Sequence, residues 1–401
     1  MAKVAIMGYG VVGSGTAEVI ITNSETIRKN AGEDISLKYI LDIRKFPGDP
    51  NESIITDDFE KILNDPEVSV VAEVMGGLNP AYDFSKRLLN AGKSVVTSNK
   101  ELVSVHGPEL MAIAKKNNVK YMFEASVGGG IPVIKPLNNC LHANEITEIK
   151  GILNGTTNYI LTQMFSEGVD FKTALADASA KGYAEKDPTA DIEGHDALRK
   201  ITILASLAWK EYVNPQGIKT VGISDISAED VEYAELLGGS IKLIGSAVKT
   251  EKGIVCSVEP QIVNCANPIF SVNGVFNCVM VTGNAVGDVM FYGQGAGKLA
   301  TASAVVSDII EAVMDKNITF PFYYEIKEKS SVLPYEETEA SFLVRADAES
   351  DIEKVSALSD KNTRIMEIKE NEIAFITEKM KISELEKKLA GMNIIKKIRI
   401  C

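Results

Sequence analysis

The feature that most constrains the fold is a glycine-rich turn that follows an apolar run at the N-terminus. Residues 3–7 (KVAIM) have the composition of a short strand, and the apolar residues from 14 to 21 have helical spacing. Between them, Gly8, Gly10 and Gly13 form the pattern G-x-G-x-x-G. The three glycines permit a tight turn, approach of the backbone to a pyrophosphate, and close helix-on-strand packing. The pattern predicts dinucleotide binding at the helix N-terminus; the alternative is a glycine-rich turn without a ligand.

Further strand-like runs alternate with helical segments over the first third of the chain. They cover residues 37–43, 68–74, 94–97 and 120–124. Strands that alternate with helices predict a mainly parallel sheet covered on both faces. We therefore expect an α/β fold class, in which a Rossmann-type doubly wound parallel sheet is followed by a second, α+β domain and a small C-terminal domain.

The pattern changes after Ile131-Pro132, and a chain of 401 residues fits two or three domains. Longer helices are expected first and strands after them, at 158–165, 171–181, 195–209, 241–249 and 254–260. A helical run at 300–314 follows the glycine-rich residues 293–297 and could return to the first domain. We expect domains at 1–131 (with a returning helix at about 295–318), 132–294 and 335–401.

The C-terminal part is more polar and has a βαββαβ order of elements. The expected strands and helices lie at 340–345, 352–359, 363–369, 372–377, 382–389 and 394–400. This order is typical of a small separate α+β domain.

Composition limits the possible partners. The net charge is -13, which would repel nucleic-acid phosphates and acidic lipid headgroups, so we expect no nucleic acid and no membrane partner. No window approaches the roughly 18 to 20 apolar residues that span a bilayer, and the N-terminus lacks a cleavable signal, so we expect a cytoplasmic protein. The 5 cysteines and 3 histidines are too scattered for a disulfide framework or a zinc site.

Two charged residues at the end of the second expected strand bear on the choice of nucleotide. An acid there favours NAD, because it binds the ribose hydroxyls, whereas an arginine favours NADP, because it binds the 2′-phosphate. Asp42 and Arg44 both lie at this point, and either could be an ordinary solvated charge. The preference stays open, with a lean to NADP.

Six further strings, in order along residues 1 to 315, resemble homoserine dehydrogenases. They are GYGVVGSG at Gly8, VTSNKELV at Val96, EASVGGGIP at Glu124, NGTTNYIL at Asn154, GYAEKDPTADIEGHDALRK at Gly182 and GAGKLATASAVVSD at Gly295. The resemblance implies an NADP- or NAD-dependent oxidoreductase that interconverts L-aspartate 4-semialdehyde and L-homoserine in threonine, methionine and isoleucine biosynthesis. It also implies that residues 132–294 bind this small-molecule substrate and form a homodimer or higher homo-oligomer. No kinase-like segment is present, so we expect a stand-alone enzyme.

The resemblance also assigns roles to the residues that carry the reaction. Lys200 would donate the proton to the aldehyde oxygen, and Lys100 would have a catalytic or substrate-polarising role beside the nicotinamide. Glu185 and Asp196 would hold homoserine, with Thr156 a further contact. Spacing alone favours a different interpretation, a surface ion pair between Asp196 and Lys200 four residues apart on a helix.

The cofactor and a cation would be held mainly by backbone groups. The expected cofactor-binding residues are Gly8, Gly10, Val11, Val12, Gly13, Arg44, Gly76, Ser98, Lys100 and Gly297. Glu124, Val127, Gly129 and Ile131 match the family's sodium site, with one carboxylate and backbone carbonyls as ligands. A glycine-rich hinge is the alternative for this stretch.

The C-terminal segment is similar in order to ACT regulatory domains. In this family such a domain can accompany feedback by an end-product amino acid. The first loop, residues 345–350, lacks the Pro-Gly typical of ligand-binding ACT domains. Packing between dimers is therefore a fair alternative to ligand control.

Overall fold

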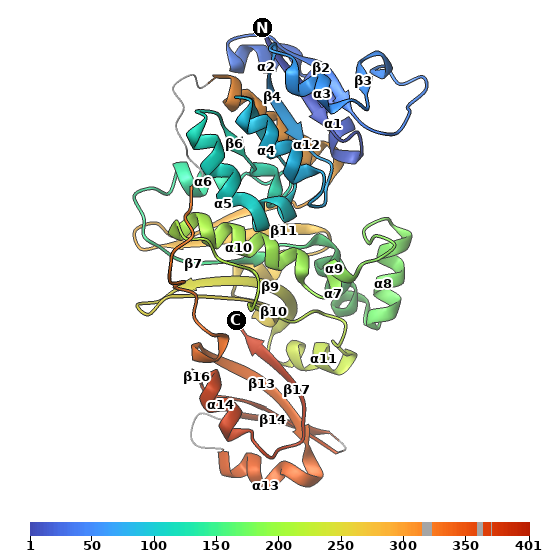
Figure 1. The fold of residues 1–401 in the computed structure, drawn as a ribbon. Coiled ribbons are helices and arrows are strands. Elements are labelled where there is room, and N and C mark those ends of the chain that lie inside the picture. The colour runs from blue at the N-terminus through green and yellow to red at the C-terminus, as the bar shows by residue number, and fades with distance from the viewer. Residues whose placement is uncertain (315–322, 359–363, 370) are drawn as a thin grey trace. The chain divides into compact units, whose positions relative to one another are not determined.

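The computed structural model describes residues 1–314, 323–358, 364–369 and 371–401, and the chain divides into two compact units. Unit 1 comprises Met1–Ile149, Arg199–Pro215 and Phe276–Ser330, and unit 2 comprises Lys150–Leu198, Gln216–Val275 and Ser331–Cys401. Figure 1 labels the elements of both units. No helix in these described ranges is long and apolar enough to cross a membrane.

Unit 1 is built on a six-stranded parallel sheet in the order β3-β2-β1-β4-β5-β6. The order places β1 and β4 at its centre, and these runs of Val, Ile and Ala are almost fully buried, as expected for strands covered on both faces. The strands are β1 (Ala2–Met7), β2 (Ile35–Leu41), β3 (Ile55–Thr56), β4 (Val68–Glu73), β5 (Ser94–Thr97) and β6 (Tyr121–Met122). The predicted Rossmann-type parallel sheet is confirmed.

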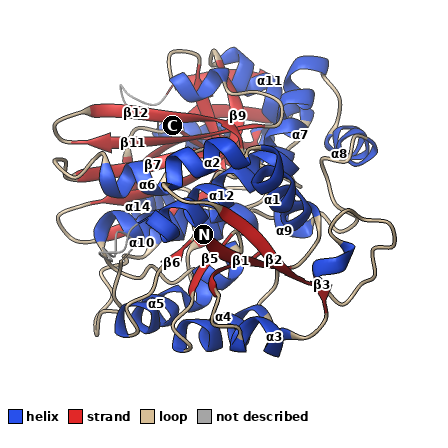
Figure 2. Ribbon diagram, turned by 90° about the horizontal axis from the view of Figure 1, so that it is seen from above, coloured by secondary structure: helices blue, strands red, loops and turns tan. Residues whose placement is uncertain are grey.

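Helices cover both faces of this sheet. Figure 2 shows α1, α2 and α12 on one face and α3, α4 and α5 on the other. The helices of unit 1 include α1 (Val11–Thr22), α2 (Ser24–Ala31), α3 (Phe59–Asn64), α4 (Ala81–Asn90), α5 (Lys100–Lys116), α6 (Ile134–Asn139) and α12 (Lys298–Met314). Helix α12 packs on α1 so closely that a Cβ on Gly15 would lie 2.7 Å from the Lys298 carbonyl oxygen. The expected returning helix is present, while residues 315–318 of its predicted range lie outside the described residues.

The structure differs from the sequence prediction at several strand boundaries. The second strand ends at Leu41 instead of residue 43, because Asp42 turns to accept hydrogen bonds from neighbouring amides. The strand expected at 120–124 is only β6, and Glu124 begins a short 3-10 helix. A hairpin of β11 (Phe276–Gly283) and β12 (Gly287–Gln294) was not predicted at all.

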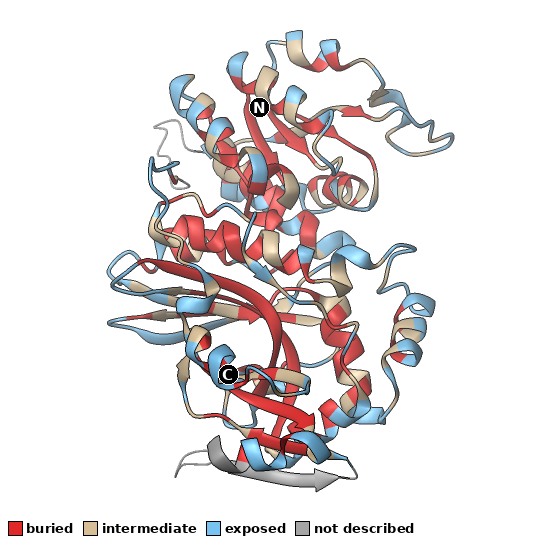
Figure 3. Ribbon diagram, turned by 60° about the horizontal axis from the view of Figure 1, so that its bottom comes forward, coloured by how far each residue is buried: buried red, intermediate tan, exposed pale blue. Residues whose placement is uncertain are grey.

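Unit 2 contains a long antiparallel pair, β9 (Gly239–Lys249) and β10 (Ile254–Asn264). Both strands are buried over most of their length, and Figure 3 shows buried residues running along the long strands. The neighbouring elements are α7 (Gly155–Glu167), α8 (Phe171–Ala180), α9 (Thr189–Ile192), β8 (Lys219–Thr220) and α11 (Ala228–Leu236). The boundary between the units falls within β7 (Ile146–Ile152) and within α10 (His195–Trp209).

The C-terminal part of unit 2 has the predicted βαββαβ order. Its elements are β13 (Glu339–Asp347), α13 (Ala348–Leu358), β14 (Arg364–Lys369), β15 (Glu372–Ile376), the short β16 (Met380–Lys381), α14 (Ile382–Lys388) and β17 (Ile394–Ile400). The four main strands lie in the order β17-β13-β15-β14, and β17 also pairs in parallel with β10. Residues 359 and 363, predicted as a helix end and a strand start, lie outside the described residues.

Candidate active site

The predicted phosphate-binding turn joins β1 to α1. A Cβ added to Gly13 would lie 1.9 Å from the Gly8 carbonyl oxygen, so this crossing of helix and strand requires glycine. A Cβ added to Gly10 would meet open space, and no side chain among the described residues caps the α1 N-terminus, where Val11 is exposed. The first amide groups of α1 are thus open to an anion.

Asp42 and Arg44 pair with each other at the end of β2. The Arg44 Nη2 atom lies 2.8 Å from Asp42 Oδ2, and Arg44 Nε lies 3.0 Å from Asp42 Oδ1. The Tyr9 amide also donates to Asp42 Oδ2 at 2.8 Å. The Arg44 guanidinium holds the pKa of the Asp42 carboxyl down, at about 2. The Asp42 carboxylate is largely occupied by protein donors, while the Arg44 side chain is 59% exposed.

A buried carboxylate organises the turn after β4. Glu73 accepts a hydrogen bond from the Met75 amide at 2.9 Å and another from the Thr97 hydroxyl at 2.7 Å. The Asn99 side chain donates to the Gly77 carbonyl oxygen at 2.6 Å and also caps α5. Burial raises the pKa of Glu73. These contacts join the turn that contains Gly76 to the segment that contains Ser98 and Lys100, all at the carboxyl edge of the sheet.

Helix α10 carries Asp196 and Lys200 one turn apart. Asp196 is 2% exposed and Lys200 is 8% exposed, so the interpretation of this pair as a surface ion pair is wrong. Within unit 1, Arg199 next to Lys200 pairs with Glu101 of α5 at 3.2 Å. This ion pair joins neighbouring positions of the two helices that carry Lys200 and Lys100.

Asn154, which was not among the predicted site residues, connects two acids in unit 2. Its side-chain amide donates to Asp191 Oδ1 at 2.7 Å and to Asp196 Oδ2 at 2.9 Å, and its side-chain oxygen caps α7. Asp191 was not predicted either. The sequence signals for these two residues were weak. Asn154 lies in the polar string 154–158, which helix capping alone explained, and Asp191 is one of several acids in the segment 182–200.

Two other predicted substrate residues lie in the same unit. The Thr156 hydroxyl donates to the Tyr183 carbonyl oxygen at 2.7 Å, which ties α7 to the segment before α9. Glu185 is exposed in that segment. Of the acids discussed in unit 2, Asp191 and Asp196 are brought together by Asn154, and carboxylates of this kind are suited to bind an ammonium group.

The predicted cation residues form a buried loop in unit 1. Glu124 Oε1 accepts from the amides of Val133 and Ile134 at 2.7 and 2.8 Å, and Oε2 accepts from the Lys135 amide at 2.7 Å. The carboxylate therefore caps the N-terminus of α6 by accepting hydrogen bonds from its first free amides. Across the described ranges, no amide donates to the carbonyl oxygens of three neighbouring residues, namely Val127, Gly129 and Ile131. These carbonyls are suited to a hard cation such as sodium.

The last predicted cofactor residue, Gly297, directly precedes α12 with φ +135°.

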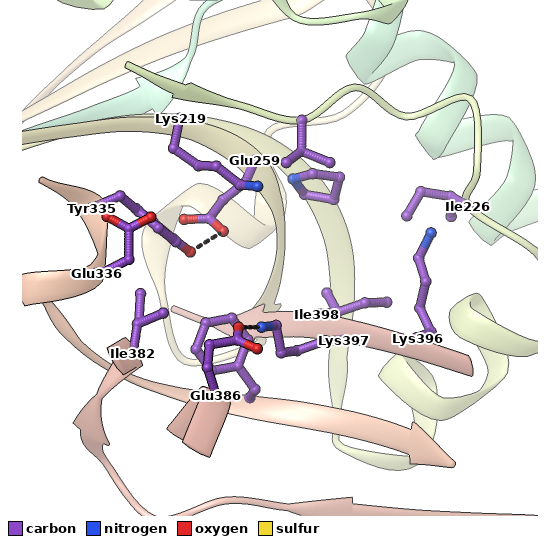
Figure 4. Close-up of a pocket in the computed structure, with 13 residues that line it drawn as sticks. Lys219, Ile226, Glu259, Tyr335, Glu336, Ile382, Glu386, Lys396, Lys397 and Ile398 are labelled. Carbon is purple, nitrogen blue, oxygen red and sulfur yellow. Dashed lines mark hydrogen bonds and ion pairs between the residues drawn. The ribbon is translucent and has the colours of Figure 1, made fainter. Parts of the chain in front are cut away.

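A separate cavity of about 300 Å³ lies within unit 2, beside the C-terminal strands (Figure 4). Tyr335 donates to Glu259 at 2.6 Å across one side, and Lys397 pairs with Glu386 at another. Its lining residues are Lys219, Val221, Ile226, Glu259, Pro260, Tyr335, Glu336, Phe342, Ile382, Glu386, Lys396, Lys397 and Ile398. Counting only described residues, the charged groups of Lys219 and Glu336 form no hydrogen bond or ion pair.

Comparison with known proteins gives consistent matches over most of the chain. Residues 132–310 match the family model described as homoserine dehydrogenase, and residues 8–124 match the model of its NAD binding domain. The chain is 42% identical to a homoserine dehydrogenase from Pseudomonas aeruginosa over 354 residues, which cover 86% of this chain and 82% of that protein.

Solved structures agree with these matches. A homoserine dehydrogenase from Thiobacillus denitrificans superposes with a TM-score of 0.91 at 34% identity, covering 100% of this chain and 98% of that one. A mutant of a hyperthermophilic archaeal homoserine dehydrogenase in complex with NADPH superposes with a TM-score of 0.66 at 28% identity, covering 78% and 98%.

Proposed function

The chain belongs to the homoserine dehydrogenase family, and on this premise we propose that Lys200 is the proton donor of its reaction. The enzyme is an NAD(P)-dependent oxidoreductase that interconverts L-aspartate 4-semialdehyde and L-homoserine, on the route to threonine, methionine and isoleucine. The nicotinamide supplies the hydride when it is bound. The protein must then protonate the oxygen of the new alcohol and hold the amino-acid end of the substrate.

The observation that supports this role is the burial of Lys200 on α10. A buried ammonium has a high desolvation cost, and a group that stabilises developing charge works best where water is excluded. Its ammonium gives a proton to the developing alkoxide, and the resulting amine takes one back in the reverse direction. Lys100 stands on the helix joined to α10 by the Arg199–Glu101 ion pair, and it polarises the same oxygen.

Carboxylates of unit 2 hold the substrate. Asp196 and Glu185 bind its ammonium and hydroxyl groups, and we add Asp191 because Asn154 holds it and Asp196 together. Anionic groups around one ammonium give charge-assisted hydrogen bonds, which are stronger than neutral ones. Thr156 orients the segment before α9 through its bond to Tyr183.

The cofactor binds at the turn after β1, and we propose that NADP is preferred. The residues that hold it are Gly8, Gly10, Val11, Val12, Gly13, Arg44, Gly76, Ser98, Lys100 and Gly297. Asp42 is occupied by Arg44 and by the Tyr9 amide, so it is a poor partner for ribose hydroxyls. The exposed Arg44 is suited to a 2′-phosphate.

A sodium ion is held by backbone oxygens of Glu124, Val127, Gly129 and Ile131. The Glu124 carboxylate accepts from three amides at the N-terminus of α6, including that of the N-cap Val133, so in this proposal Glu124 contributes its carbonyl oxygen instead. The supporting observation is that the carbonyl oxygens of the other three residues accept from no amide among those described.

In this proposal residues 335–401 form an ACT-like regulatory domain. The cofactor-binding domain comprises 1–131 and about 295–318, and the substrate-binding and dimerisation domain comprises 132–294. The cavity beside β17 favours ligand control, since Lys219 and Glu336 offer opposite charges to a zwitterion. Thermal unfolding with L-threonine, L-methionine and L-isoleucine tests this proposal. Stabilisation by one of them that is lost in Lys219→Ala supports it, whereas no shift with any of the three favours a packing role.

A homodimer forms through the edge strand β12. Met290 and Tyr292 are exposed on this strand, which pairs only with β11 in the described part of the sheet. Exposed edge strands with apolar side chains are sites of pairing with another chain. Light scattering on Tyr292→Lys tests the assignment, because a charge at the edge would favour the monomer.

The main experiment follows the absorbance of reduced nicotinamide with L-homoserine and either NAD or NADP. Lys172 is an exposed residue of α8, so Lys172→Ala is a suitable control. Wild-type protein and this control should produce reduced cofactor at equal rates. Lys200→Ala should lose about 10²- to 10⁴-fold in kcat while still binding cofactor. Normal turnover by Lys200→Ala would refute the proton-donor assignment.

A further inference from the structure

Tyr9 occupies the variable position between the first two glycines of the phosphate turn, yet its side chain is only 6% exposed. The turn itself requires glycine on either side but no particular side chain at this position. The Tyr9 hydroxyl donates to Asp49 at 3.0 Å and accepts from the Asn51 side-chain amide at 3.0 Å. Tyr9 therefore connects the phosphate turn to the segment of residues 42–54, which follows β2.

The same segment carries Arg44, and the contacts from Tyr9 lead directly to it. The Phe46 ring packs edge-on against the Tyr9 ring, with centroids 5.0 Å apart. The Arg44 guanidinium lies 5.2 Å from the centroid of Phe46. The Asp49 amide donates to the Phe46 carbonyl oxygen at 3.1 Å, so the position of Asp49 affects Phe46.

We propose that Tyr9 is a positioning residue that sets the preference of the site for NADP over NAD. Its backbone amide holds Asp42, and its side chain fixes the loop that presents Arg44. The inference rests on the proposed cofactor site, because a 2′-phosphate must bind at Arg44 for the loop to matter. A nucleotide without this phosphate makes no use of Arg44 and depends less on Tyr9.

Tyr9→Phe is the informative variant, since it keeps the ring against Phe46 and removes only the hydroxyl. The hydrogen bond from the Tyr9 hydroxyl to the Asp49 carboxylate helps to order the loop, so its loss weakens the presentation of Arg44. The expected result is about five- to tenfold weaker NADPH binding with less than about a twofold change for NADH. The value of kcat at saturating cofactor should not change.

A matched control variant is available at Tyr39, in the strand that pairs with β1. Tyr39 in β2 also donates its hydroxyl to a carboxylate, Asp65, at 2.9 Å, but it is not part of the cofactor turn. Binding of NADPH and NADH is measured by titration calorimetry for wild type, Tyr9→Phe and Tyr39→Phe. The same titrations in an Arg44→Ala background complete a double-mutant cycle, which isolates the coupling between the two residues.

Selective loss of NADPH affinity in Tyr9→Phe, absent in Tyr39→Phe and absent when Arg44 is already alanine, supports the proposal. Equal losses for both nucleotides, or no loss beyond that of Tyr39→Phe, overturn it while leaving the cofactor site intact. Failure of the wild-type protein to bind either nucleotide overturns the proposed cofactor site and this inference together.

Discussion

Replacement of Glu124 by glutamine tests the role of its carboxylate at the start of α6. Glutamine can keep the two bonds that Oε1 accepts from Val133 and Ile134. Its amide nitrogen would then face the Lys135 amide, which now donates to Oε2 at 2.7 Å. Two donors cannot bond, so one buried N–H loses its partner at a cost of about 1–3 kcal/mol.

The loss of charge weakens the two remaining bonds by a further ~1 kcal/mol, because bonds to ionised acceptors are the stronger ones. Relief of the buried charge offsets part of this cost, since burial raises the pKa of Glu124. After this offset, the net expectation for Glu124→Gln is a loss of about 1–3 kcal/mol in the free energy of unfolding. For a cooperative unit of about 200 residues this corresponds to a fall in Tm of roughly 2–12 °C.

The assay is thermal unfolding by circular dichroism in sodium chloride and in choline chloride. Glu25→Gln is the matched control, because Glu25 is exposed in α2 and pairs only with Lys29 among described residues. It should unfold within about 1 °C of wild type. A Glu124→Gln variant as stable as this control would refute the capping argument. Sodium-specific stabilisation that survives in Glu124→Gln supports carbonyl ligation, and its loss would show that the carboxylate is a ligand.

Three further expectations follow from the site. Burial raises the pKa of Glu73, so its stabilising contribution is complete below the ordinary pKa of glutamate and is lost as pH rises through the raised value. Glu73→Gln should show a smaller decline of unfolding free energy over that window, as measured by urea titration; an unchanged slope would contradict this. Asn154→Ser keeps a capping oxygen but loses the amide that donates to Asp196, so KM for homoserine should rise about tenfold, and an unchanged KM would argue against the link. The buried Asp196 carboxylate also loses a donor, so Tm should fall by a few degrees. Gly13→Ala places a Cβ against the Gly8 carbonyl oxygen and should weaken NADPH binding at least about hundredfold in a titration, and normal affinity would show that the crossing can relax.

The sequence predicted five of the six strands of the parallel sheet, because each of these five is a short apolar run bounded by glycine or polar residues. The remaining strand, β3 (Ile55–Thr56), is only two residues long and was not predicted. The hairpin of β11 and β12 was not predicted, although both strands contain residues that favour strands. Residues on β12 alternate between exposed and half-buried, so this strand lacks the run of buried residues that marks β4.

The candidate site residues also differ in whether a local sequence pattern could predict them. The role proposed for the glycines of the turn depends only on residues adjacent in sequence, so the pattern could predict it. Asn154 and Asp191 are 37 residues apart, and their contact exists only in the folded chain. Asp42 and Arg44 gave opposite indications about the nucleotide, and no local pattern could show that they bind each other.

Asp196 and Lys200 show why spacing alone could not separate a surface pair from a buried one. Both interpretations place an acid and a base four residues apart on a helix, and exposed pairs of this kind contribute only about 0.3–0.5 kcal/mol. The difference is burial, which the sequence of one helix does not determine. At 2% and 8% exposure the two charges carry a desolvation cost that often exceeds their mutual attraction. Apolar residues at these positions would serve stability at least as well. The burial of both charges therefore supports the proposal that Asp196 anchors the substrate and Lys200 donates the proton.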